Sequence, residues 1–105
     1  MDRFKTFEEF WPFYLNEHSK PQNRLLHFIG SSLGIVFLVT AVVTMKPMFI
    51  LAGLFVGYLF AWVGHFFIEK NRPATFKYPL WSFLGDWKMW YWTLTGKINS
   101  YYEKK

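Results

Sequence analysis

The sequence contains no cysteine. Disulfides and thiolate metal ligands are therefore excluded, and any metal that this chain binds must be held by nitrogen and oxygen atoms. No nucleophile elbow, glycine-rich phosphate loop or thiol dyad is present either. The sequence therefore offers none of the short motifs that indicate the common nucleophilic hydrolases or a phosphate-binding loop.

Charged residues are also missing from two long stretches, Leu25 to Thr44 and Pro47 to Ile68. Each stretch is long enough to cross a hydrocarbon core of about 30 Å, which takes about 20 helical residues. The N-terminal residues lack the basic and then apolar order of a secretory signal. We therefore expect both stretches to be retained as transmembrane helices, over 25–44 and 47–68.

Acidic residues are few, with 7 Asp and Glu against 12 Lys and Arg, which gives a net charge of +5. The basic residues flank the apolar stretches instead of gathering on one helix face, so we expect no nucleic-acid partner. Only Lys46 lies at the tip between the two stretches. The positive-inside rule then places both termini in the cytosol, beside anionic lipid headgroups. The membrane would be the inner membrane of a bacterium or the endoplasmic reticulum of a eukaryote.

The remaining segments predict aromatic helices at the membrane surface. Thr6 and Glu9 have the spacing of a capping box, which predicts a short aromatic helix that Pro12 kinks or breaks. Residues 1–23 should therefore form an interfacial segment and a loop. Apolar and aromatic residues at helical intervals predict a second interfacial helix over 79–96, and the charged tail beyond it is expected to fray.

Together these elements predict one all-α domain over 1–105, an integral membrane hairpin of two transmembrane helices flanked by aromatic-rich interfacial helices. Lys46 and Pro47 favour a tight turn, so the two helices should be antiparallel. Small residues at four-residue intervals should let the helix backbones approach closely. These residues are Gly30 and Gly34 in the first helix and Gly53, Gly57 and Ala61 in the second.

All three histidines are expected at one end of this hairpin. His27 and His65 each lie nineteen residues from Lys46, so the constant helical rise of about 1.5 Å per residue places them at the same depth. Continuing the four-residue intervals of the small residues turns both histidines toward the facing helix. His18 lies in the polar loop that precedes the hairpin. Because neutral imidazole is a common ligand for iron and zinc, the three side chains form a candidate metal site.

Three other residues are candidates to complete this site. Glu69 lies one turn beyond His65 and offers a carboxylate as a fourth ligand or catalytic group, or as a partner for an arginine. Asn23, one turn before the histidine of the first helix, is a candidate to orient a ligand from the second coordination shell. Asp86 is a candidate to cap the site, or to pair with Ser82 one turn away.

Two arginines flank the hairpin on the side of the histidines, Arg24 and Arg72. Each offers a forked donor that suits a carboxylate or phosphate near the headgroup plane, which would make it a binding or catalytic residue. The alternative is that both side chains extend from helix ends to the membrane surface.

Two segments of the sequence resemble the Mpo-like family of small membrane proteins. The first is FYLNEHSKPQNRLLHFIG and the second is WVGHFFIEKNRPATF, and the resemblance covers residues 13–86. It implies an Fe(II)-dependent dioxygenase that shortens 2-hydroxy fatty acids by one carbon in α-oxidation, as the family's fungal enzyme of the endoplasmic reticulum does. It also implies that His18, His27 and His65 are the essential histidines and that Glu69 matches the acidic position of the second segment.

This resemblance agrees with the chemistry expected of the residues. An iron held by imidazoles with open positions can bind a substrate and dioxygen together. The carboxylate and hydroxyl of a 2-hydroxy acid would chelate that iron, while the alkyl tail lies in the bilayer or along the aromatic segments.

Three other interpretations remain compatible with the sequence. The chain would be a non-catalytic membrane module that binds lipid or a partner, a haem protein with His27 and His65 as axial ligands, or a zinc hydrolase. Small residues left over from the helix pair also leave homo-oligomerisation open.

Overall fold

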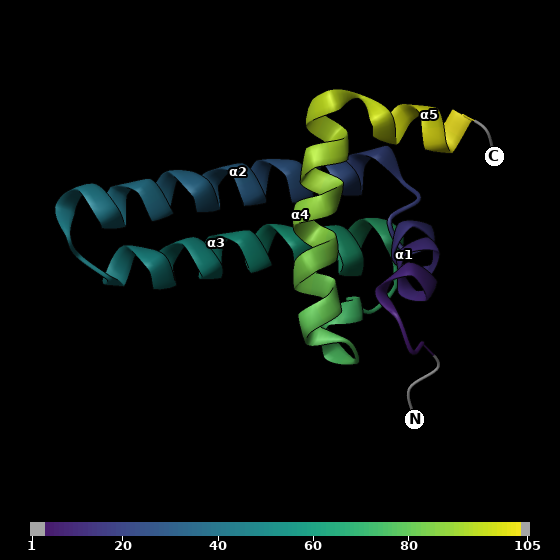
Figure 1. Ribbon diagram of the computed structural model, residues 1–105, viewed down its shortest axis with the longest axis horizontal. Coiled ribbons are helices and arrows are strands. Elements are labelled where there is room, and N and C mark those ends of the chain that lie inside the picture. The colour runs from purple at the N-terminus through teal and green to yellow at the C-terminus, as the bar shows by residue number, and fades with distance from the viewer. Residues whose placement is uncertain (1–3, 104–105) are drawn as a thin grey trace.

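The computed structural model describes residues 4–103, and every regular element in that range is helical. Its longest elements are helix α2 (Pro21–Thr44) and helix α3 (Met48–Val63), which the π-helix η1 (Gly64–Glu69) continues. Figure 1 shows α2 and α3 as a long antiparallel hairpin that projects from the rest of the molecule. The prediction of an all-helical hairpin is confirmed, and both of its helical segments are long and apolar enough to span a membrane.

The remaining helices gather at the open end of the hairpin (Figure 1). Helix α4 (Pro79–Thr95) crosses α2 and α3 there, while helix α1 (Phe7–Asn16) and helix α5 (Lys97–Glu103) lie beyond the crossing. A short 3-10 helix, η2 (Ala74–Phe76), leads into α4. We call the projecting part of the α2–α3 hairpin the arm. Its open end, together with α1, η2, α4 and α5, is the base.

The ends of the hairpin helices have local causes. Helix α2 begins at Pro21, before the uncharged stretch, because proline suits the first position of a helix, where no backbone donor is needed. At the tip, Met45 adopts a left-handed φ of 59°, and the Lys46 amide donates to the Ala41 carbonyl over 3.2 Å. Pro47 then precedes α3, so the tight turn expected at Lys46 and Pro47 is present.

Helix α1 corrects one expectation. The Thr6 hydroxyl accepts a hydrogen bond from the Glu9 amide over 3.2 Å, as the capping-box spacing predicts. The helix is nevertheless continuous through Pro12, so the predicted break is wrong. Pro12 is exposed, and the opposite face holds the fully buried Phe10 and Leu15, whose packing keeps the helix intact despite the missing donor.

The C-terminal segment corrects another expectation, because residues Lys97–Glu103 form α5 instead of a frayed tail. Gly96, at a φ of 82°, turns the chain out of α4 as its C-cap. Ile98 is 4% exposed within the base. Ile98 supplies the packing that a short helix needs. The charged residues at both ends of the segment hid this signal in the sequence.

The core lies in the base and is mostly aromatic. Its buried residues are Phe10, Trp11, Tyr14, Leu15, Ala74, Tyr78, Met89 and Ile98. The hairpin buries few of its residues by comparison. In the most apolar windows of its two helical segments, only 17% and 22% of the residues are buried. Its outward side chains, such as Val43 and Phe55, are exposed, and contiguous apolar surface of this kind marks an interaction or membrane site.

Two glycines set the distance between α2 and α3. A Cβ atom at Gly30 would lie 2.8 Å from the Phe60 Cβ, and one at Gly53 would lie 2.9 Å from the Phe37 Cβ. Such contacts are too short for any larger residue. The close packing predicted from the small residues is therefore confirmed at Gly30 and Gly53.

Candidate metal centre

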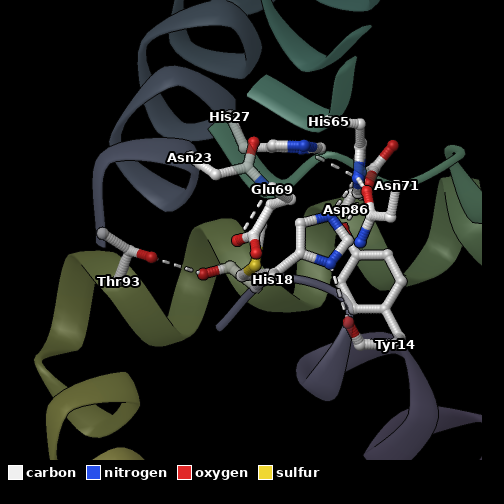
Figure 2. Close-up of polar contacts among 10 residues, drawn as sticks. Tyr14, His18, Asn23, His27, His65, Glu69, Asn71, Asp86 and Thr93 are labelled. Carbon is white, nitrogen blue, oxygen red and sulfur yellow. Dashed lines mark hydrogen bonds and ion pairs between the residues drawn. The ribbon is translucent and has the colours of Figure 1, made fainter. Parts of the chain in front are cut away.

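The three histidines meet where the loop after α1, helix α2 and the π-helix η1 converge. The ring centroids of His18 lie 4.5 Å from those of both His27 and His65, and the latter two lie 5.1 Å apart. All three residues are buried, and one ring nitrogen of each lies within 4.8 Å of the others. Figure 2 shows the imidazoles pointing toward one another. The predicted convergence of the histidines is confirmed, and the group could hold a metal ion.

A π-helix positions His65. Over Gly64–Glu69 the chain widens from the α-helical pitch, and this element ends at Lys70, whose φ is 64°. Gly64 lies so close to α2 that a Cβ atom there would fall 1.8 Å from Asn23 Oδ1. Short π-helical segments are frequent at functional sites, because one extra residue re-aims the side chains of the turn.

The outer ring nitrogens of two histidines have fixed acceptors. His18 Nδ1 lies 2.7 Å from the Tyr14 carbonyl oxygen, which can only accept, so this nitrogen carries the hydrogen. His65 Nδ1 lies 2.7 Å from Asn71 Oδ1. The Asn71 amide nitrogen donates to the Glu17 carbonyl over 3.1 Å, which fixes the amide orientation and makes His65 Nδ1 a donor as well.

The inner nitrogens of the same residues then carry lone pairs that face each other. His18 Nε2 and His65 Nε2 are 3.0 Å apart. Neither carries a hydrogen in the neutral tautomers fixed by Tyr14 and Asn71, so the contact is repulsive unless a cation or a proton lies between them. Burial and the two neighbouring imidazoles lower the pKa of His18 well below its usual value, which disfavours the proton.

A metal ion fits this arrangement. Two nitrogens at about 2.1 Å from one ion and about a right angle apart are separated by roughly 3.0 Å. His27 Nε2 is buried and has no hydrogen-bond partner among the described residues, so this nitrogen is available as a third ligand. Donation of each outer N–H to a carbonyl or amide oxygen is the usual support of a metal-bound histidine.

A small cavity borders the three rings. It has a volume of about 10 Å³, enough for one ion or one water molecule. Besides the histidines, Tyr14, Ala61, Ser82 and Asp86 line it. The Ser82 hydroxyl is buried without a hydrogen-bond partner among the described residues, so a polar group faces this space.

Asp86 is the carboxylate nearest to this space. It accepts a hydrogen bond from the Tyr14 hydroxyl, and its Oδ1 lies 3.9 Å from His27 Nδ1. Burial raises the pKa of Asp86 to about 7, against the opposing effect of the Tyr14 hydrogen bond. A cation held by the histidines would favour its ionised form. Asp86 was a candidate to cap the site or to pair with Ser82. The structure brings it to His27 and Tyr14, and it forms no hydrogen bond with the Ser82 hydroxyl.

Comparison with protein families adds an independent finding. A family model described as 2-hydroxy-palmitic acid dioxygenase Mpo1-like matches residues 4–98. The chain belongs to this Mpo1-like family. The match includes all three histidines and runs from before α1 into α5. Comparisons with curated proteins and with solved structures found no match.

Glu69 of this Mpo1-like chain lies outside the histidine group. Its Oε2 accepts hydrogen bonds from the Lys20 amide over 2.8 Å and from the Asn23 side-chain amide over 3.2 Å. Its Oε1 accepts from the Ser19 hydroxyl over 3.3 Å. The carboxylate therefore ties η1 to the loop that carries His18, and Asn23 contacts Glu69 and Gly64 in the same junction.

The two predicted arginines have different surroundings. Arg24 Nη1 donates to the carbonyls of His18 and Ser19 over 2.8 Å each, and its guanidinium lies 3.9 Å from the Tyr102 ring centroid. Arg72 is exposed and lines a separate cavity of about 400 Å³. Pro73 and Ala74 border both this cavity and the one beside the histidines.

Sequence reasoning missed three residues that support the Mpo1-like site. Tyr14 stacks on His18 with 4.1 Å between ring centroids, and its position one helical turn before His18 was the available signal. Asn71 and Tyr102 gave no such signal, because each reaches the site across a turn or from a distant helix. The Tyr102 hydroxyl donates to the carbonyls of Leu15 and His18 over 2.5 and 3.1 Å.

Proposed function

We propose that this chain is an integral membrane Fe(II)-dependent dioxygenase that shortens a 2-hydroxy fatty acid by one carbon. The observation that carries the proposal is the pair of facing lone pairs on His18 Nε2 and His65 Nε2, 3.0 Å apart in a buried site. Such a pair is repulsive unless a cation or a proton lies between the nitrogens, and burial disfavours the proton. The family description supplies the reaction class, since it names a 2-hydroxy-palmitic acid dioxygenase.

His18, His27 and His65 would hold the iron, which supplies positions for dioxygen and the 2-hydroxy acid and electrons to activate them. The reaction balances without another reductant. Cleavage of the bond between the carboxyl carbon and the hydroxylated carbon gives a shorter fatty acid, carbon dioxide and water. The four electrons that reduce dioxygen all come from the substrate.

The chain's other residues have separate roles in this proposal. Asp86 lies beside His27 and can accept or release a proton there, and the Tyr14 hydroxyl holds its carboxylate in place. Arg72 would attract the substrate carboxylate from its cavity next to the centre. We assign Glu69 and Arg24 to positioning the His18 loop. Glu69 binds that loop and Asn23 of α2, and Arg24 binds the loop and contacts Tyr102 of α5.

We place the hairpin in the membrane with the site at its cytosolic boundary. The apolar faces of α2 and α3 are exposed along the arm, whereas the base carries the aromatic core. Nineteen residues separate Lys46 from His27, and their helical rise of about 28 Å is close to the thickness of a hydrocarbon core. Helices α1 and α4 would then lie at the interface, with both termini on the cytosolic side.

The arrangement favours a single ion over a haem. An axial pair formed by His27 and His65 would need space for a macrocycle between the two rings. Their centroids are 5.1 Å apart, and the ring of His18 lies within 4.5 Å of both. A Soret band in the purified protein would contradict this assignment.

The direct test is anaerobic purification followed by elemental analysis and by oxygen uptake with fatty acids. We expect iron, and we expect oxygen uptake with 2-hydroxypalmitic acid but not with palmitic acid. Zinc with ester or amide hydrolysis would favour a hydrolase instead. A non-catalytic lipid-binding module would be supported by two results together. The protein would hold no metal after reconstitution with Fe(II), and a His27→Ala variant would bind lipid as well as the wild type.

A further inference from the structure

A long apolar groove leads away from the metal centre. It lies between α2 and α3 and has a volume of about 250 Å³. Phe83 and Trp87 of α4 contribute to its wall, and Leu38 and Ile50 line it farthest from the histidines. For scale, a dry apolar cavity of about 150 Å³ is enough to bind benzene. The groove therefore has room for an apolar ligand.

The groove adjoins the cavity beside the three imidazoles. His27, Ala61 and Asp86 line both spaces. His27 is 5% exposed, and its Nε2 has no hydrogen-bond partner among the described residues. An apolar groove that ends at an unpartnered buried nitrogen and a carboxylate matches a molecule with a long apolar part and a polar head.

Four glycines line the groove, but helix packing explains only two of them. Gly30 and Gly53 lie against the facing helix so closely that a Cβ atom would clash. A Cβ atom at Gly34 would instead lie 3.8 Å from its nearest neighbour, the Gly53 carbonyl, and one at Gly57 would lie 3.7 Å from the Gly30 carbonyl. These are ordinary contacts. Alanine would fit at Gly34 and Gly57 without moving either helix, so packing does not require glycine there.

We propose that this groove binds the alkyl chain of the substrate, and that Gly34 and Gly57 are glycines because a larger side chain would fill the space that the alkyl chain occupies. The inference rests on the proposed function for the identity of the substrate. Gly57 lies opposite Gly30, three residues beyond His27, and so borders the alkyl chain close to its reacting end. Gly34 borders it farther out.

The length of the groove agrees with this occupant. Leu38 lies eleven residues beyond His27 in α2, which corresponds to about 16 Å of helix. Half of a hydrocarbon core of about 30 Å is nearly the same distance. An alkyl chain from one leaflet would therefore fill the groove while its carboxyl head stayed at the level of the histidines.

The first test locates the alkyl chain of the substrate without relying on turnover. The full-length protein in phosphatidylcholine vesicles is photolabelled with a 2-hydroxy fatty acid that carries a diazirine at its terminal carbon. We expect the label on the peptides that contain Leu38 and Ile50, and we expect excess 2-hydroxypalmitic acid to compete with it. Labelling spread over exposed positions such as Val42 and Phe55, without competition, would overturn the inference.

The second test uses chain length as the readout. Gly34→Leu fills the outer half of the groove, so kcat/KM for 2-hydroxypalmitic acid should fall about tenfold or more while that for 2-hydroxyoctanoic acid changes little. Gly57→Leu should lower both. The matched control is Val42→Leu on the outer surface, which is 70% exposed and should change neither. Equal losses for the two substrates in Gly34→Leu would contradict the assignment.

The two tests separate this inference from the proposed function. Competed labelling of the groove in a protein that shows no oxygen uptake would support alkyl-chain binding and count against the dioxygenase. Oxygen uptake whose chain-length preference is unchanged in Gly34→Leu would support the dioxygenase and count against the groove. If Gly34→Leu changes only the oligomeric state, the groove is an interface between two copies, and the inference fails.

Discussion

The chemistry of the centre depends on which nitrogen of each imidazole carries the hydrogen. Tyr14 and Asn71 each hold an outer N–H, and this leaves the inner nitrogens of His18 and His65 facing each other as acceptors. Histidine alone does not distinguish a metal site from a hydrogen-bonded pair. The supporting acceptors favour a metal site, since they hold both rings in a tautomer that can bind a metal.

Asn71 offers a test of this support. Replacement by leucine removes the acceptor of His65 Nδ1 and the donor to the Glu17 carbonyl, so His65 can adopt the other tautomer. We expect the affinity for Fe(II) to fall about 10- to 100-fold, as measured by anaerobic titration. Asn99→Leu, at an exposed position of α5, is the control. An Asn71→Leu affinity equal to that of the wild type would show that the amide has no such role.

At the scale of elements, the sequence predicted the hairpin better than the turn that carries the site. Uncharged length and small-residue intervals located α2 and α3, and the distances of His27 and His65 from Lys46 predicted their common depth. The π-helix at Gly64–Glu69 was missed, because four-residue intervals assume an α-helix throughout. The Glu69 carboxylate was accordingly a candidate for a ligand, a catalytic group or the partner of an arginine, whereas it binds the loop before α2.

Gly64 tests the junction between η1 and α2. A methyl group there would overlap the amide of the fully buried Asn23, so Gly64→Ala should cost about 1 to 3 kcal/mol in the free energy of unfolding and weaken metal binding. Gly34→Ala is the matched control, because its methyl group meets only an ordinary contact at 3.8 Å. Equal stability of the two variants in denaturant unfolding would contradict this packing.

Helix α5 is expected to hold the His18 loop from outside. Tyr102→Phe removes the hydrogen bonds to the carbonyls of Leu15 and His18 but keeps the ring beneath Arg24. We expect a loss of about 1 kcal/mol in stability and weaker Fe(II) binding. Tyr91→Phe, at an exposed position in α4, should change neither. Unchanged Fe(II) affinity in Tyr102→Phe would restrict α5 to a packing role.

At the scale of the whole molecule, the arm and the base differ in what they expose. The arm exposes apolar side chains, whereas the base buries its aromatic residues in a core. The apolar runs predicted the arm, but the packing of the base could not be predicted, because it depends on contacts between α1, α4 and α5 that local patterns do not encode. Phe10, Trp11 and Tyr14 illustrate this: their spacing indicated an aromatic face, and only the fold shows that this face is buried.

The membrane orientation can be tested with single cysteines, because the natural sequence has none. A thiol reagent that does not cross membranes should label Lys46→Cys from the extracytosolic side of sealed vesicles and Ser100→Cys from the cytosolic side. Labelling of both from one side, or recovery of the protein without detergent as a soluble monomer, would contradict a hairpin that spans the bilayer.

The central claim is that His18, His27 and His65 bind one iron, and the most direct measurement is anaerobic titration of the metal-free protein with Fe(II). The account predicts one Fe(II) per chain and a rise in stability of about 2.7 kcal/mol when free Fe(II) is a hundredfold above its dissociation constant. It predicts no such site in His65→Ala. Absence of binding by the wild type, or equal binding by His65→Ala, would contradict the account.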